Sequence, residues 1–364
     1  MSATPQPNTA TADHTDNERS AESSAPDQKC VSIIFNPVSG QTDPEARKKS
    51  ITDALTEHGY TCIFIETSKE VGGEELAKKA ISDGVDLIAV SGGDGTVIEV
   101  LSAAIGSDIP IAVLPAGTGN LLSVNLGIPA TVPEAVHVAL SGQPYQLDLG
   151  RSNDGKHFAI MGGLGLDARM INDADREAKK RLGVFAYLWA ALKNLPRRGA
   201  YVEIVLDGRP PIRSRAKSVL IANMGKVTGG LEAMPTASPN DGLLDVGVIK
   251  AETLGQWLRI AGYALIGRAH DAPDLDVYQA KKISVRTPNP EPIEFDGESG
   301  GDTREWNVEV VPRCVSVLLP EGGPAAMDAS ETPEAVARRS FTGLAIGAGV
   351  LLAIALVVVN RRRR

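Results

Sequence analysis

The sequence predicts an α/β protein with an N-terminal parallel α/β domain, a C-terminal antiparallel β-sandwich domain and a C-terminal transmembrane helix. Up to residue 146, short apolar runs alternate with segments of helical period, which is typical of a parallel sheet covered by helices. From residue 147, strand-like runs follow one another with few helices between them, which favours antiparallel pairing. Residues 341–360 then form a long apolar stretch without a charge.

The composition of the 364-residue chain sets the first limits. With 43% apolar and 23% charged residues, the chain can bury one large or two medium cores. The net charge of -8 argues against a protein that coats nucleic acid, so we expect no nucleic-acid partner. Cys30, Cys62 and Cys314 are far apart and odd in number, which supports neither a disulfide framework nor a thiolate metal site and favours a reducing compartment.

Residues 1–29 are expected to be a disordered tail. They contain no Ile, Leu, Val or aromatic residue, so they cannot bury enough surface to offset the entropy of ordering. They also lack the apolar run of a secretory signal. We therefore expect the folded part of the protein in the cytoplasm.

Residues 30–146 are expected to form the first domain. Asp43 and Pro44 indicate a helix start, because an aspartate oxygen can accept free N–H groups there and proline presets φ. The expected strands are Val31–Asn36, Cys62–Glu66, Leu87–Ser91 and Ile111–Leu114, with helices at Pro44–His58 and Glu74–Ser82. Ligands of such a sheet bind beyond the carboxyl ends of the strands, which directs attention to the loops there.

Residues 147–320 are expected to form the second domain, and residues 321–340 a linker. Two helices are expected here, Lys180–Asn194 and Ala251–Ile266. The expected strands are Gln146–Arg151, Phe158–Met161, Tyr201–Leu206, Ser218–Ala222, Leu244–Ile249, Lys282–Arg286, Trp306–Val311 and Val315–Leu319. A mostly antiparallel β-sandwich is the simplest fold for this series.

Residues 341–360 are predicted to cross a membrane as a single helix, since at about 1.5 Å per residue they nearly span the ~30 Å hydrocarbon layer. Two arginines precede the segment and four follow it, so the arginine count alone would place the tail in the cytosol. The missing secretory signal outweighs that count, and we expect a single-pass protein of the cell membrane with cytoplasmic domains. Gly343 and Gly347 are spaced as in a helix dimer, which allows a homodimer. A buried or interfacial helix is the alternative.

A glycine-rich loop follows the third expected strand. Ser91–Thr96 reads SGGDGT and leads into an apolar helix pattern. Glycines let the backbone approach a phosphate, and a helix start presents free N–H groups to negative charge. Neither the dinucleotide fingerprint nor a Walker P-loop is matched, because Ile98 occupies the third glycine position and no GxxxxGK[ST] occurs. By itself, the loop could also be a tight turn without a ligand.

Two further small-residue loops follow neighbouring strands. Asn36–Gly40 comes after the first strand and Pro115–Asn120 after the fourth. The carboxyl ends of parallel strands lie at one edge of a sheet, so the three loops are expected to meet there. Together they would form a polar cup of phosphate size.

In this order and at this spacing, the three loops resemble those of the diacylglycerol and sphingosine kinase family of lipid kinases, whose first domain is NAD-kinase-like. The resemblance extends over roughly residues 30–320 and is nearest to the soluble bacterial diacylglycerol kinases. The matching residues of the second domain are Gly163, Gly165, Asp167, Ala168, Pro235, Asn240–Leu243 and Asp296–Glu298.

The resemblance implies transfer of the γ-phosphate of ATP to a lipid hydroxyl, with ATP and Mg²⁺ as cofactors and a diacylglycerol-like or long-chain-base acceptor in the bilayer. Glu298 falls on the position of the catalytic base, and Asp94 on the acid that serves nucleotide and magnesium. Asp241, with the backbone carbonyls of Ser238 and Leu243, falls on a second, structural magnesium site. The implied nucleotide contacts are Asn36, Pro37, Val38, Ser39, Gly40, Thr67, Gly92, Gly93, Asp94, Gly95, Thr96 and Thr118.

The chemistry of these residue types agrees with the implied roles. Phosphoryl transfer depends mostly on positioning and charge neutralisation, so a backbone cradle, a metal-holding carboxylate and one base are sufficient. One position departs from the family, because Leu121 stands where many members have Asp, which makes the rim more apolar and leaves open a different lipid. Two alternatives also stay open: a membrane-anchored nucleotide- or lipid-binding protein with little catalysis, and a kinase of a soluble hydroxyl compound.

Overall fold

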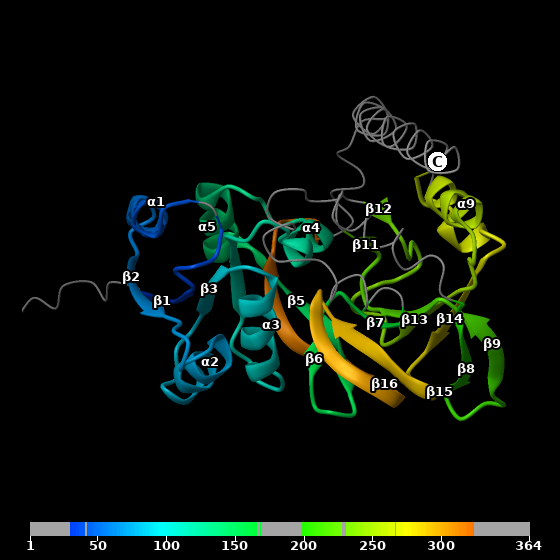
Figure 1. The fold of residues 1–364 in the computed structure, drawn as a ribbon. Coiled ribbons are helices and arrows are strands. Elements are labelled where there is room, and N and C mark those ends of the chain that lie inside the picture. The colour runs from blue at the N-terminus through cyan, green and yellow to red at the C-terminus, as the bar shows by residue number, and fades with distance from the viewer. Residues whose placement is uncertain are drawn as a thin grey trace, which may run out of the picture.

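The protein folds as two halves that share one large sheet (Figure 1). The first half, in blue to teal, lies at one side of the molecule, and the second half, in green to orange, at the other. The computed structural model describes residues 30–40, 42–165, 168, 198–227, 231–265 and 267–323.

The first half contains the predicted parallel α/β arrangement. Its strands pair in the order β2-β1-β3-β4, all parallel, and the buried strands β3 and β4 are apolar on both faces, as a covered parallel sheet requires. The strands are β1 (Cys30–Phe35), β2 (Thr61–Glu66), β3 (Ile88–Gly92) and β4 (Ile111–Pro115). The helices are α1 (Pro44–Glu57), α2 (Gly73–Ser82), α3 (Asp94–Ala103), α4 (Leu121–Leu126) and α5 (Val132–Ser141).

Helices cover both faces of this parallel sheet. α1 and α5 pack on one face, where Ile33 of β1 and Ile51 of α1 share a core. α2 and α3 cover the other face, where Ile34 is buried. The alternation of Ile33 and Ile34 between two cores follows from the period of two in a strand. The predicted helix start is confirmed, since the side chain of Asp43 accepts a hydrogen bond from Ala46 N at 2.9 Å.

The second half is antiparallel and curls around its own apolar core, which includes Phe158, Val219 and Trp306. Its strands pair in the order β14-β13-β10-β7-β15-β16, and β11 and β12 form a separate hairpin. The strands are β5 (Gln143–Ser152), β6 (His157–Phe158), β7 (Met161–Gly165), β8 (Ala200–Leu206), β9 (Ile212–Ala216), β10 (Ser218–Ala222), β11 (Lys226–Val227), β12 (Leu231–Glu232), β13 (Leu244–Ile249), β14 (Leu275–Ala280), β15 (Lys282–Phe295) and β16 (Glu298–Leu319).

The long strand β16 joins the two halves. It pairs antiparallel with β15 and β5, and its last part lies parallel to β4, with Val317 opposite Ile111 as the registered pair. A register shift between Val311 and Val315 separates the two parts that the sequence predicts as distinct strands. The sheets of the two halves are therefore continuous through β16.

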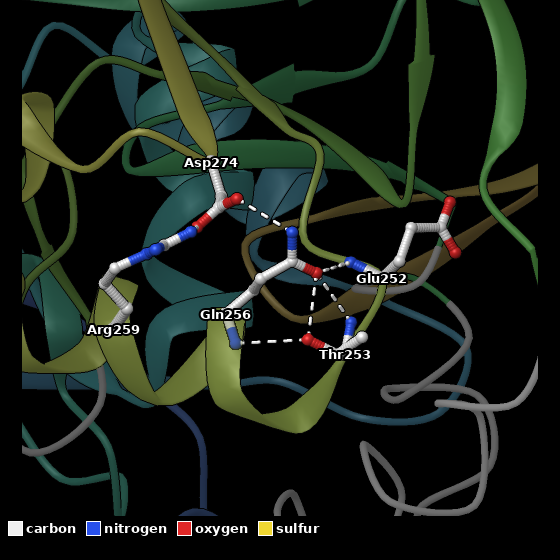
Figure 2. Close-up of polar contacts among 5 residues, drawn as sticks. All are labelled: Glu252, Thr253, Gln256, Arg259 and Asp274. Atoms are coloured by element: carbon white, nitrogen blue, oxygen red, sulfur yellow. Dashed lines mark hydrogen bonds and ion pairs between the residues drawn. The ribbon is translucent and has the colours of Figure 1, made fainter.

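Helix α9 (Leu254–Leu265) is held on the second half by a polar network around its first turn (Figure 2). The side-chain oxygen of Gln256 accepts from the backbone N–H groups of Glu252 and Thr253, both at 2.9 Å. Its amide donates to Asp274, which also binds Arg259. This arrangement resembles a capping box, and the short 3₁₀ helix η1 (Ala269–Asp271) packs beside it.

Most predicted elements are present in the structure, but α4, α5, β9, β11, β12, β14 and η1 were not predicted from the sequence. The expected strand Lys282–Arg286 continues to Phe295 in β15, and the expected strand Phe158–Met161 is divided between β6 and β7. Within the part of the chain that the structure describes, no helix is both long and apolar enough to span a bilayer. The predicted tail at 1–29, the helix Lys180–Asn194, the linker beyond residue 323 and the membrane helix at 341–360 lie outside the described residues.

Candidate active site

The three small-residue loops meet at one edge of the parallel sheet. Asn36 N donates to Ser91 O at 2.9 Å, and Gly93 N donates to Ser39 Oγ at 3.2 Å, so the first two loops are bonded together. The third loop packs directly against the second, because a Cβ added to Gly117 would lie only 2.8 Å from the Cα of Gly93. The predicted meeting of the loops is therefore seen in the structure.

The first loop has a fixed shape. Asn36 accepts from Val38 N at 3.1 Å and donates from Nδ2 to Thr96 Oγ1 at 2.7 Å, so its side chain ties the first loop to the second. Gly40 has φ +82°, and a Cβ there would lie 2.1 Å from the carbonyl oxygen of Ala116. Both the backbone angle and the close contact require glycine at this position.

Arg47 of α1 supports the first loop from below. Its side chain is buried and donates to the carbonyls of Ser39 at 2.6 Å and Asn36 at 2.5 Å, while its guanidinium lies 4.3 Å from the centre of the Phe35 ring. Burial lowers the pKa of this arginine from its usual value. Sequence reasoning missed Arg47, although its place on the apolar face of α1, one turn before Ile51, is a readable signal.

Asp94 is the first residue of α3 and faces the third loop. Its Oδ1 accepts from Leu122 N at 3.2 Å, and a Cβ on Gly119 would lie 3.2 Å from Oδ2. The cap residue Gly93 has no side chain to occupy the first N–H groups of α3. A helix start of this kind attracts negative charge.

Glu298 reaches this helix start from the second half of the molecule. It is the first residue of β16, and a Cβ added to Gly95 would lie 2.7 Å from Glu298 Oε1. Only a glycine at position 95 leaves room for the carboxylate. The acid expected from the second half thus lies against the glycine loop that carries Asp94.

Asp296 stabilises the turn that immediately precedes Glu298. Its carboxylate accepts from the backbone N–H groups of Ala159 (2.8 Å), Ile160 (3.0 Å) and Met161 (2.9 Å). The residue itself has φ +48°, a left-handed conformation that these bonds stabilise. Burial raises the pKa of Asp296 to about 6, against the lowering effect of the three N–H groups, and Asp94 raises it further.

Both halves of the chain match known protein families. The model of the diacylglycerol kinase catalytic domain matches residues 31–152, and that of the YegS C-terminal NAD kinase beta sandwich-like domain matches residues 162–319. The chain belongs to the diacylglycerol kinase family. It is therefore an enzyme, a lipid kinase whose family uses ATP.

Individual relatives cover most of this lipid kinase. An uncharacterised protein of Synechocystis is 30% identical over 307 residues, 79% of this chain and 70% of that protein. The diacylglycerol kinase of Bacillus subtilis is 28% identical over 305 residues, 82% of this chain and 99% of that protein. A crystal structure of a diacylglycerol kinase from Bacillus anthracis superposes with a TM-score of 0.67 at 26% identity and covers 81% of this chain and 98% of that one.

A second acidic region of the lipid kinase surrounds Asp241. This exposed residue accepts from Leu243 N at 2.9 Å, and Ser238 lies three residues before it. Asp148 and Asp245 are buried. Burial raises the pKa of each of these acids, and the nearby negative charge of Asp241 raises it further. Asp148 accepts from the N–H groups of Gly242 and Arg313 at 2.7 and 2.6 Å.

Asp148 was missed from the sequence, although a carboxylate between Leu147 and Leu149 in an apolar strand is a readable signal. Across the described ranges, no group of three or more His, Cys, Asp or Glu side chains is close enough to hold a metal on its own. A cation at Asp241 would therefore need backbone oxygens as well, as the family resemblance implies for Ser238 and Leu243.

The remaining expected nucleotide contacts lie at the rim. Thr67 follows β2 and donates from its backbone to Phe35 O at 2.9 Å, beside the first loop. Thr118 is exposed on the third loop, and Val38 is 88% exposed on the first. Asp167 of the second-domain signature lies outside the described residues.

Proposed function

We propose that this lipid kinase phosphorylates a diacylglycerol-like or long-chain-base lipid with Glu298 as the general base. The observation that carries the proposal is the approach of Glu298 Oε1 to Gly95 at the start of α3. Glu298 would accept the proton of the lipid hydroxyl while the hydroxyl oxygen of the lipid forms a bond to the γ-phosphorus of ATP. The bond from phosphorus to the bridging oxygen then breaks, and ADP leaves.

The three loops are proposed to hold the nucleotide. Free N–H groups at the start of α3 would stabilise the phosphates, and the bonds of Asn36 and Ser39 fix the loops around them. The proposed contacts are Asn36, Pro37, Val38, Ser39, Gly40, Thr67, Gly92, Gly93, Asp94, Gly95, Thr96 and Thr118.

Asp94 is proposed to hold Mg²⁺ together with the nucleotide. Its carboxylate faces the third loop and raises the pKa of Asp296, and carboxylate oxygens suit Mg²⁺. Mg²⁺ is commonly bound by one or two carboxylates plus substrate phosphates, so a full protein cage is not needed. When bound, the ion would neutralise charge on the transferred phosphoryl group.

Asp241 is proposed to hold a second Mg²⁺ with the carbonyls of Ser238 and Leu243. The support is electrostatic, because Asp241 makes the buried acids Asp148 and Asp245 harder to ionise. A cation beside these three carboxylates would offset that cost. The role of this site would be structural, as the family resemblance implies.

The segment 341–360 is proposed to anchor the kinase, with its catalytic part in the cytoplasm and homodimers formed through Gly343 and Gly347. A lipid substrate stays in the bilayer, so an anchor raises the effective concentration of enzyme beside it. The support is the uncharged apolar sequence of this segment.

The test is phosphate transfer from labelled ATP to lipids by the full chain in detergent micelles, with mass spectrometry of a phosphorylated lipid extract to identify the acceptor. Glu298→Gln is expected to lower kcat by about 10²–10⁴-fold, the usual contribution of a general base, with unchanged ATP affinity. Glu75→Gln, an exposed change on α2, is the control. Full activity of Glu298→Gln would remove the base assignment, and ATP binding without turnover on any lipid would favour a binding protein.

A further inference from the structure

The two catalytic acids stand on different halves of the molecule, so their separation depends on how the halves meet. Asp94 begins α3 in the first half, and Glu298 begins β16 in the second. The sheets join through β4 and β16, where Val317 opposite Ile111 is the registered pair. The two halves also share an apolar core, in which Leu122 and Leu126 of α4 lie with Ile160 and Met224 of the second half. Apolar contacts are non-directional, so the exact separation at the edge of the sheet that carries the loops is left to polar contacts.

Asn125 of α4 makes such a contact. Its Oδ1 accepts from Lys226 N at 2.9 Å, and its Nδ2 donates to Lys226 O at 2.9 Å and to Leu121 O at 2.9 Å. The side chain thus pairs with the backbone of β11 as a neighbouring strand would, and its remaining donor is bound within α4. Figure 1 shows α4 between the first half and the β11–β12 hairpin.

A pocket lies beside this contact. Asn125 and Lys226 line this pocket of about 540 Å³, together with Tyr145, Met224 and Leu319. A cavity supplies no dispersion contacts across its width, so it cannot hold the two walls at a fixed distance. The hydrogen bonds of Asn125 join α4 to β11 beside this pocket.

The first turn of the same short helix contacts Asp94. Leu122 N donates to Asp94 Oδ1, and Asn125 lies three residues further along α4. On the other wall, Met224 N donates to Ile160 O, and Ile160 N donates to Asp296, which shapes the turn before Glu298. Each end of the Asn125 contact therefore leads by short hydrogen-bonded steps to one of the catalytic acids.

We propose that Asn125 is a positioning residue that sets the distance between Asp94 and Glu298 by tying α4 to β11. The inference rests on the proposed function, since it requires both acids to act on the same substrate. Loss of the contact lets the edge of the sheet open, so the two acids no longer meet at one reacting centre. The nucleotide loops belong to the first half alone, and their affinity for ATP does not depend on the contact.

The experiment compares Asn125→Ala and the isosteric Asn125→Asp with the full-length enzyme. Asp has no amide donors and sets a carboxylate against the two carbonyls of Leu121 and Lys226. Both variants are expected to lower kcat on lipid about tenfold or more, because small misplacements of reacting groups are costly, while the Kd for an ATP analogue changes less than about twofold. Hydrogen exchange of the Lys226 amide is expected to speed up in both.

Asn153→Ala is the matched control, because Asn153 binds the backbone of Asn307 on the exposed surface of the second half. It is expected to keep kcat. Unchanged kcat in Asn125→Asp, or equal losses of kcat, ATP affinity and melting temperature, would overturn the proposal. If Glu298→Gln stays active, the base assignment fails, and the role of Asn125 in setting the distance to Glu298 fails with it. If Glu298→Gln loses kcat while Asn125→Asp keeps it, the positioning role alone is removed.

Discussion

Two regions of this lipid kinase gather carboxylates, one around Asp94 and Glu298 and the other around Asp148 and Asp241. In the first, the acids come from both halves of the molecule and face a helix start across glycines that leave room for the two carboxylates. In the second, Asp148 is fully buried and bound to backbone N–H groups of its own half. The acids of the first region therefore meet across the two halves, whereas Asp148 is bonded within the second half alone.

Asp296→Asn is expected to cause the largest loss of kcat in the first region, apart from removal of the proposed base Glu298 itself. An amide presents only one acceptor to the three N–H groups of Ala159, Ile160 and Met161, so the left-handed turn loses its support and Glu298 shifts. We expect kcat to fall about 10²-fold with ATP affinity retained, since positioning errors near 1 Å have that size. Steady-state kinetics and calorimetric ATP titration measure this, and a normal kcat would contradict the role of the turn.

Gly95→Ala is expected to separate activity from stability. The new methyl group would lie 2.7 Å from Glu298 Oε1 and displace the carboxylate, which lowers kcat about tenfold through lost alignment. The same change favours the helical conformation of α3 by about 0.5–1 kcal/mol. Thermal unfolding and kinetics together test both effects.

The control for this change is Gly262→Ala in α9, where an added Cβ meets nothing within 4 Å. It should give the helical gain without the kinetic loss. Equal kcat in both variants would show that Glu298 does not need the space above Gly95.

Removal of Mg²⁺ tests the second region. In the absence of nucleotide, the free energy of unfolding of the wild type should be about 2.7 kcal/mol higher with Mg²⁺ at about 100 times its Kd than with EDTA. The reason is that an ion bound only to the native state stabilises that state. Asp241→Asn should lose most of this shift in melting temperature and keep its kcat, whereas the exposed Asp108→Asn should keep both. An equal Mg²⁺ shift in Asp241→Asn and wild type would exclude a cation at Asp241.

The smallest expected effect concerns Cys314, whose reactivity reports how well the second region is shielded from solvent. Burial, with a contribution from Asp148, raises the pKa of this thiol to about 11. A raised pKa leaves about one thousandth of the thiol as reactive thiolate at pH 8, so alkylation should be slow in the native protein and increase tenfold per pH unit up to about 11. Mass spectrometry of iodoacetamide-treated protein measures the rate, and rapid alkylation at pH 8 would contradict the closed environment.

The sequence predicted the parallel half well because its signals are local. Strands, glycine loops and the Asp43 cap are read from adjacent residues, and each is present in the structure. Helix α4 was missed because its six residues are too few to show a period.

The nonlocal features of the site could not be predicted in the same way. The Asp296–Gly297–Glu298 motif was recognised, but the role of Asp296 depends on N–H groups more than a hundred residues away in the chain. Asn125 carries no signal at all, since a single asparagine in the short, mostly apolar stretch Leu121–Leu126 predicts nothing about a distant backbone. The pairing of β16 with β4 likewise comes from topology, which no local pattern contains.

The place of β16 in the fold also bears on synthesis. Val315, Val317 and Leu319 belong to the same core as Ile88 and Val90 of β3, so the first half completes its interior with residues near the end of the described chain. A nascent chain leaving the ribosome cannot finish this interior until that strand has emerged, and long-range pairings of this kind fold slowly. Chaperone binding to the unfinished first half is the expected result during translation.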